Sequence, residues 1–233
     1  HFALVTDWPD APTEQVAGDE ELVAALADGI DRLNAKHEGP SAGGERFLLL
    51  HRRRLWNESE GKWIGWERKR GKLHELNELL CGAADTTFIP VRGRPPVVPE
   101  NVRYVITLDA DTRLPKGTAY RLVGAMAHPL NRPRFDPQCE RIVEGYAVLQ
   151  PRITPFLPTG PGSTPYQRIV SGPGGVDPYG SEASDVYQDL FEEGSYAGKG
   201  IYDVSAFRLA LEGKVPENSL LSHDLFEGVF ARA

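Results

Sequence analysis

The strongest constraint on the fold is an alternation of short apolar runs, typical of buried strands, with longer segments whose apolar residues recur every three or four positions. The pattern predicts strands at residues 2–6, 47–50, 104–108 and 145–152, and helices at residues 19–33, 67–80 and 116–127. Strands and helices that alternate in this way form a mostly parallel sheet whose faces are covered by helices. The sequence therefore predicts an α/β fold with a mixed, mainly parallel sheet flanked by helices.

Several segments depart from this alternation. The turn-forming residues 57–61 predict a hairpin that has residues 63–66 as its second arm. Residues 155–180, which are rich in Pro and Gly, predict a long loop, and residues 184–191 regain helical character. Residues 194–200 predict a glycine-rich turn that leads into a further strand.

The composition is that of a globular polypeptide with one large or two small domains. The chain has 233 residues, of which 40% are hydrophobic and 25% are charged. No apolar run approaches the roughly 18 residues of a membrane span. The net charge of −7 argues against nucleic acid as a partner, because that interaction requires clustered cations. Cys81 and Cys139 lack metal-ligand spacing, and we expect both to be free thiols in a reducing compartment.

The two ends of the chain predict a domain that belongs to a longer protein. The chain opens within a strand-like run and without an initiator Met, and it stops within a helix-like run at residues 225–233. We therefore expect residues 1–233 to be a single domain without a signal peptide.

Two carboxylates follow directly on the strand at residues 104–108. Asp109 and Asp111 are separated only by the small Ala110, so in an extended chain both side chains point to the same side. Two such acids repel each other unless a cation lies between them, and oxygen ligands of this kind suit Mg²⁺ or Mn²⁺. The alternative is a polar strand end that enters a turn or caps a helix.

Polar residues also end the first predicted strand. In α/β folds, ligands bind at the carboxyl ends of the strands. We therefore expect Thr6 and Asp7 to converge with Asp109 and Asp111 on one cleft. Basic residues cluster at residues 52–54 and 68–72, which predicts either a solvated surface or a site for a bound anion.

Four features in fixed order give the chain a family resemblance. They are a basic segment at residues 71–77, the Asp-Ala-Asp-Thr at 109–112, the glycine-rich turn at 194–200 and the Ser-His-Asp at 222–224. Together they resemble the inverting, nucleotide-sugar-dependent glycosyltransferases of the cellulose-synthase type, which have the Rossmann-like GT-A fold. The chain is most similar to the glycosyltransferase domain of cyclic β-1,2-glucan synthases. The supporting stretches are FALVTDWPDA (2–11), WERKRGKLHELN (66–77), GKGIYD (198–203) and LSHDLFEG (221–228).

The resemblance implies a nucleotide-sugar site with a divalent cation. Asp109 and Asp111 would contact the nucleotide and hold Mg²⁺ or Mn²⁺ on the diphosphate of UDP-glucose, whose leaving charge the cation neutralises. Arg68 and Lys72 would add positive charge near the same diphosphate, although either could equally belong to a solvated helix start. Thr6 and Asp7 would complete this site.

The resemblance also implies a catalytic base and a sugar-binding segment. Asp224 would remove the proton of the acceptor hydroxyl, although an Asp in this position is also typical of a helix cap. Gly198, Lys199 and Gly200 would approach a sugar, or the glycines would serve a tight turn that needs positive φ. His223 would lie beside the acceptor. It departs from the Glu that many relatives have here, so its own role stays open.

The resemblance places the chain within a membrane-embedded polypeptide at the cytoplasmic face of the bacterial inner membrane. Residues 1–115 would form the nucleotide-binding half and residues 116–233 the half for the glucan acceptor. The Gln-x-x-Arg-Trp motif of processive relatives has no match and would lie beyond Ala233. We therefore expect this chain to bind its donor weakly and to turn over poorly when isolated.

Two other classes of protein remain as alternatives. A haloacid-dehalogenase-type phosphatase also has Asp-x-Asp after a strand, but it wants Thr or Val where this chain has Arg113, and its motif normally lies near the start of the domain. A non-catalytic module that binds nucleotide sugars is the second alternative. The retention of Asp109, Asp111 and Asp224 argues against such a module.

Overall fold

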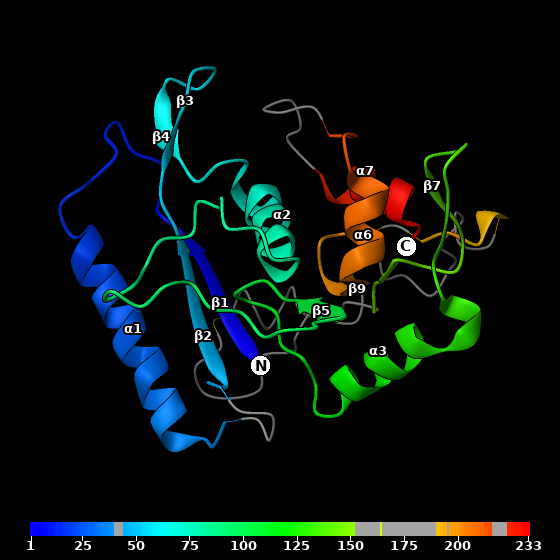
Figure 1. The fold of residues 1–233 in the computed structure, drawn as a ribbon, viewed down its shortest axis with the longest axis horizontal. Coiled ribbons are helices and arrows are strands. Elements are labelled where there is room, and N and C mark those ends of the chain that lie inside the picture. The colour runs from blue at the N-terminus through cyan, green and yellow to red at the C-terminus, as the bar shows by residue number, and fades with distance from the viewer. Residues whose placement is uncertain (40–43, 152–163, 165–189, 195, 216–222) are drawn as a thin grey trace. The chain divides into compact units, whose positions relative to one another are not determined.

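The structure, a computed structural model, describes residues 1–39, 44–151, 164, 190–194, 196–215 and 223–233 (Figure 1). The chain divides into two compact units. The first unit is His1–Val102, and the second comprises the described residues from Arg103 onward. The functional halves that the sequence suggests, 1–115 and 116–233, concern ligand binding and stay a prediction.

The first unit is built on two parallel strands with a helix on either side. Strand β1 (Phe2–Asp7) pairs with β2 (Phe47–Arg52), and the register sets Asp7 opposite Arg52. Helix α1 (Asp19–Lys36) connects the two strands and packs against β2, while α2 (Arg68–Leu80) packs against β1 (Figure 1). Leu50, Leu76 and Phe88 form the buried core between the sheet and α2.

A hairpin joins the end of β2 to α2. Its arms are β3 (Leu55–Asn57) and β4 (Lys62–Ile64), which pair antiparallel as expected. The side chain of Asn57 stabilises the turn by accepting hydrogen bonds from the backbone NH of Glu60 and the hydroxyl of Ser59.

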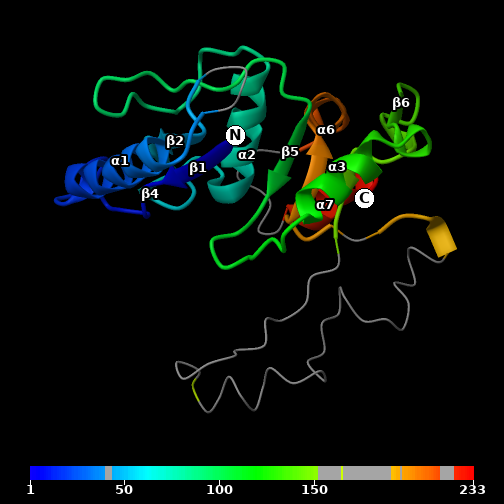
Figure 2. The same cartoon turned by 90° about the horizontal axis from the view of Figure 1, so that it is seen from below.

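The second unit is built on a three-stranded antiparallel sheet. Its central strand β9 (Gly200–Asp203) is fully buried and lies between β5 (Tyr104–Thr107) and β8 (Val148–Leu149). Helix α3 (Thr118–Ala127) covers this sheet and contributes Leu122 and Met126 to a core around Ile201 (Figure 2). A 3₁₀ turn, η1 (Pro129–Asn131), follows α3.

Two helices and a hairpin complete the second unit. Helix α6 (Val204–Leu211) begins directly after β9, where the side chain of Asp203 caps it by accepting the NH of Ala206. Helix α7 (Asp224–Ala231) packs against α6 and against β7 (Arg141–Glu144). Strand β7 forms a hairpin with β6 (Arg134–Asp136), which the sequence pattern did not reveal.

The mixed α/β class is confirmed, with sheets smaller than the sequence suggested. Among the described strands, only β1 and β2 pair parallel, and all other pairs are antiparallel. The strand expected at 145–152 is reduced to β8. Gly145 is not part of a strand because its φ of 64° is not extended. Only glycine fits there, since a Cβ would lie 2.0 Å from the carbonyl oxygen of Arg132.

Two further expectations concern residues that the structure does not describe. The predicted loop at 155–180, except residue 164, and most of the helix at 184–191 fall outside the described residues.

In the part of the chain that the structure describes, no helix is both long enough and apolar enough to cross a membrane.

Candidate functional site

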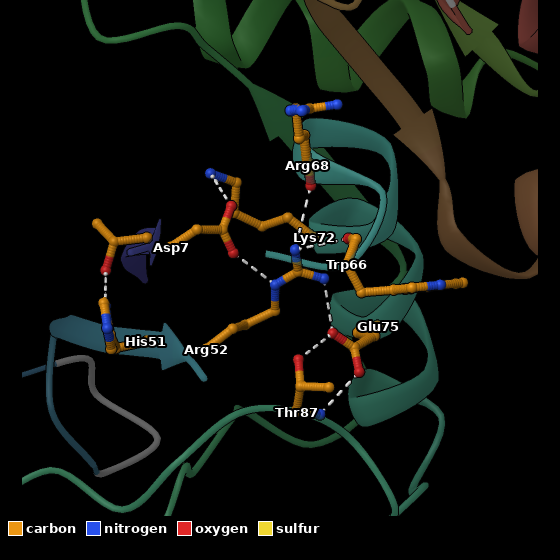
Figure 3. Close-up of polar contacts among 9 residues, drawn as sticks. Asp7, His51, Arg52, Trp66, Arg68, Lys72, Glu75 and Thr87 are labelled. Carbon is orange, nitrogen blue, oxygen red and sulfur yellow. Dashed lines mark hydrogen bonds and ion pairs between the residues drawn. The ribbon is translucent and has the colours of Figure 1, made fainter. Parts of the chain in front are cut away.

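A buried arginine organises the polar end of the first unit (Figure 3). Arg52 ends β2 and has no exposed surface. Its Nε donates to Asp7 Oδ1 at 2.6 Å, and its Nη1 donates to Glu75 Oε2 at 2.7 Å. Its Nη2 donates to the carbonyl oxygens of Trp66 at 2.9 Å and Arg68 at 3.2 Å. A guanidinium can be buried only when its donors are satisfied in this way, so Arg52 ties β1, β2 and α2 together.

Asp7 and Lys72, both expected at the nucleotide site, lie side by side in this network. The Lys72 ammonium is 2.8 Å from Asp7 Oδ2, so the Asp7 carboxylate is shared between Lys72 and Arg52. Gly65 permits this arrangement, because a Cβ at that position would lie 2.8 Å from Asp7 Cγ. The Lys72 side chain keeps partial exposure, and a ligand anion can therefore reach its charge.

Arg68 makes different contacts from those of Lys72. Its side chain is half-exposed and lies 3.1 Å from the carboxylate of Asp10 and 2.6 Å from that of Glu60. Hydrogen bonds to these acids raise the pKa of the Arg68 guanidinium, and the bond to Glu60 has the larger effect. The backbone of Arg68 and Glu67 has positive φ, at 47° and 51°, which is strained for residues other than glycine. The bond from Arg52 to the Arg68 carbonyl helps to hold this conformation.

The arginine run at 52–54 is mostly internal. Arg52 and Arg54 are buried, and only Arg53 is exposed. Arg54 pairs with Asp19 of α1 at 2.5 Å and also donates to the carbonyl oxygen of Pro9. The run therefore anchors α1 and α2 to the sheet, and the interpretation as a solvated surface is wrong for two of its three residues.

Thr6 contacts a buried histidine. Its Oγ1 lies 2.7 Å from His51 Nδ1, and the ring of Trp8 packs edge-on against the imidazole at 4.1 Å. Burial lowers the pKa of His51 from 6.5 to about 4, because the charged imidazolium would lose its hydration. His51 is therefore neutral at pH 7.

This buried histidine predicts a loss of stability in mild acid. As the pH falls below 6.5, the unfolded chain takes up a proton that folded His51 refuses until about pH 4. The free energy of unfolding should therefore decrease across this window, by about 3 kcal/mol in total. Urea denaturation of the wild type and of His51→Gln between pH 7 and pH 4 measures the difference. Equal pH slopes for both proteins would contradict the prediction.

In the second unit, a lysine lies among the acids expected to do the chemistry. Lys199 Nζ is 3.0 Å from Asp109 Oδ2. The pKa of Lys199 is raised, chiefly by this hydrogen bond, and the charges of Asp111 and Asp224 act in the same direction. The Asp109 carboxylate is thus paired with an ammonium group, and the binding of Mg²⁺ or Mn²⁺ by Asp109 and Asp111 stays a prediction.

The glycines beside Lys199 have structural reasons for being glycine. Gly198 has φ 72°, in the left-handed region. A Cβ at Gly200 would lie 2.4 Å from the carbonyl oxygen of Leu149, so the backbone can pass β8 only without a side chain. The hydroxyl of Thr107 is within 3.3 Å of the Gly198 carbonyl oxygen. These contacts support the tight-turn alternative, and the expected sugar contact stays a prediction.

Asp224 is the first residue of α7 and is not its cap. The residue before it, His223, occupies the cap position without making a side-chain cap bond. His223 Nδ1 lies 3.3 Å from Asp224 Oδ1 and 3.2 Å from Glu227 Oε1. Tyr196 is buried beside these groups, and burial raises the pKa of its phenol, with the charges of Glu227 and Asp224 contributing. The helix-cap alternative for Asp224 is therefore wrong.

The structure thus gathers the expected residues into two groups. Thr6, Asp7 and Lys72 belong to the first unit, with Arg68 on its exposed side. The second unit holds the other expected residues: Asp109, Asp111, Gly198, Lys199, Gly200, His223 and Asp224. Convergence of the two groups on one cleft stays a prediction.

Sequence reasoning missed Glu75 and Glu227 as members of these clusters, and it interpreted Arg52 as part of a solvated surface or an anion site. Glu227 carried a usable signal, since a residue three positions after Asp224 shares its helix face. Arg52 and Glu75 carried none, because only the strand register and the packing of α2 bring them together.

The chain thus has a mixed α/β fold in which an Asp at or just after the end of a strand is paired with a Lys in each unit. Asp7 of β1 is paired with Lys72, and Asp109 after β5 is paired with Lys199. No family model matches the chain. It is 50% identical over 232 residues to a protein of Rhizobium meliloti (strain 1021) described as "Cyclic beta-(1,2)-glucan synthase NdvB". The alignment includes 100% of this chain but 8% of that protein. The chain therefore corresponds to a small segment of that relative.

Proposed function

We propose that the chain is the glycosyltransferase portion of a cyclic β-1,2-glucan synthase, with a GT-A-type fold. It transfers glucose from UDP-glucose to a growing glucan, with inversion at the anomeric carbon. It does so within a larger membrane-embedded polypeptide, at the cytoplasmic face of the bacterial inner membrane. The observation that carries the proposal is the contact of Lys199 with Asp109, which follows β5, in a unit whose charges of Asp111 and Asp224 also act on Lys199. The similarity of the whole chain to a segment of a glucan synthase favours a transferase over a dehalogenase-type phosphatase.

The residues of the second unit divide the chemistry between them. Asp109 and Asp111 would hold Mg²⁺ or Mn²⁺, which neutralises the charge of the leaving diphosphate when it is bound. Lys199, which is bonded to Asp109, would exchange this bond for one with a donor phosphate and so keep positive charge near the leaving group. Asp224 accepts the proton of the acceptor hydroxyl while that oxygen forms its bond to the anomeric carbon and the bond to the diphosphate breaks.

The residues of the first unit would contribute to donor binding. Lys72 is partly exposed and is held in place by Asp7, which Arg52 in turn fixes. An ammonium group positioned in this way can meet an anionic ligand without first losing side-chain freedom. Arg68 is tied to Asp10 and Glu60, and it would have to leave these acids to contact a diphosphate.

The cation site predicts a metal-dependent affinity for UDP. Asp111→Ala should remove the part of the UDP affinity that Mn²⁺ adds in the wild type, because one of two oxygen ligands is lost. Calorimetric titration of UDP with and without Mn²⁺ measures this part. Asp85→Ala, which removes an exposed carboxylate of the first unit, is the matched control. Mn²⁺-dependent binding that persists undiminished in Asp111→Ala would overturn the assignment.

A further inference from the structure

Three potential metal ligands converge at the start of α7. His223 and Asp224 begin the helix, and Glu227 lies one turn later on the same face. One nitrogen of His223 and one carboxylate oxygen from each acid all lie within 4.8 Å of one another. The two measured approaches to His223 Nδ1, 3.3 Å from Asp224 and 3.2 Å from Glu227, match the spacing between neighbouring ligands on a small metal ion.

Each of the three side chains has a buried polar atom without a hydrogen-bond partner in the described part of the chain: His223 Nδ1, Asp224 Oδ1 and Glu227 Oε2. In Glu227 this atom is the second carboxylate oxygen, since Oε1 is the one that lies 3.2 Å from His223. The Glu227 residue is only 3% exposed. A buried carboxylate without a partner is costly, and two adjacent ones repel each other. The cluster of His223, Asp224 and Glu227 therefore lacks a group that accepts electron pairs from all three side chains.

Nearby cations do not complete it. Among the described residues, neither Asp224 nor Glu227 forms an ion pair with a Lys or Arg. The charge of Asp224 acts on the Lys199 ammonium group, but Lys199 is bonded to Asp109. The positive end of α7 opposes a bound cation, but with a charge of only about +0.5 against two carboxylates.

We propose that His223, Asp224 and Glu227 form a binding site for a divalent transition metal ion such as Zn²⁺. One imidazole nitrogen and two carboxylate oxygens form a donor set that suits Zn²⁺ and leaves a coordination position open. Asp109 and Asp111 offer oxygen atoms alone, which suit Mg²⁺ or Mn²⁺. The chain thus has two cation sites with different chemical preferences.

A metal ion bound by His223, Asp224 and Glu227 would affect catalysis if Asp224 is the base, and this consequence rests on the proposed function. A carboxylate oxygen that binds a metal ion cannot also accept a proton from the acceptor. Occupation of this site by Zn²⁺ therefore blocks transfer, whereas Mg²⁺ or Mn²⁺ at Asp109 and Asp111 supports it.

Titration of the chain with Zn²⁺ tests the site directly, by calorimetry and, with Co²⁺ as a visible probe, by absorption. We expect a Zn²⁺ site that is retained in Asp111→Asn and weakened more than about tenfold in Glu227→Gln. Glu212→Gln, which alters an exposed acid just after α6, is the control and should bind like the wild type. His223→Gln is a second ligand variant, in case Glu227→Gln fails to fold.

The outcomes separate this proposal from the proposed function. Failure of the wild type to bind Zn²⁺, or unchanged binding in a folded Glu227→Gln or His223→Gln, would overturn the metal site. UDP binding is measured in the same samples and should be equal in wild type and Glu227→Gln. Loss of UDP binding by the wild type would count against the transferase and would leave the Zn²⁺ result untouched.

Discussion

Replacing Arg52 with methionine should lower the free energy of unfolding by about 3–5 kcal/mol. The Arg52 guanidinium is fully buried and donates to two carboxylates and two carbonyl groups. Methionine fills much of the volume but leaves Asp7 and Glu75 without this partner. Lys72 keeps its bond to Asp7, and Thr87 keeps two bonds to Glu75, which limits the loss. Urea denaturation at pH 7 measures the change.

Arg53→Met is the matched control for this experiment. Arg53 is the next residue along the chain, but its side chain is exposed. The same substitution there should change the free energy of unfolding by no more than about 0.5 kcal/mol. Equal effects at the two positions would show that the Arg52 network contributes little to stability.

The elements of the fold could be predicted where local pattern decides them. Helix α1 follows from its apolar period and acidic first turn, and β1, β2 and β5 follow from their apolar, β-branched runs. The pairing of the strands could not be predicted in this way. Strand β9 pairs antiparallel with β5 across about a hundred residues of chain, and nothing local in either strand encodes that choice.

The candidate site shows the same division. Asp109 and Asp224 could be found because short motifs carry them, and Lys199 because it lies between two glycines of such a motif. The contact between Lys199 and Asp109 depends on β5 and β9 pairing in a register that brings Thr107 opposite Gly200. The burial of Arg52 could not be predicted, because the residue type does not tell whether an arginine is buried or exposed, and only the packing of the fold decides it.

The base assignment predicts the largest change in activity. An inverting transfer needs one base near the acceptor hydroxyl, on the face opposite the leaving diphosphate. Asp109 is bonded to Lys199 and, with Asp111, would hold the cation on the leaving-group side, so neither suits this task. Asp224 begins a helix that packs against α6 and β7, which gives its carboxylate a rigid support.

In the full-length protein, Asp224→Asn should therefore lower transfer from UDP-glucose by about 10²–10⁴-fold, the usual contribution of a general base. Asparagine keeps the shape of the side chain but cannot take up the acceptor proton. Binding of UDP-glucose, measured by calorimetry, should stay near the wild-type value, because the proposed role of Asp224 concerns the acceptor. Asp85→Asn, at an exposed position, should leave both quantities unchanged. Retained transfer in Asp224→Asn, or lost donor binding with an intact fold, would show that Asp224 has another role.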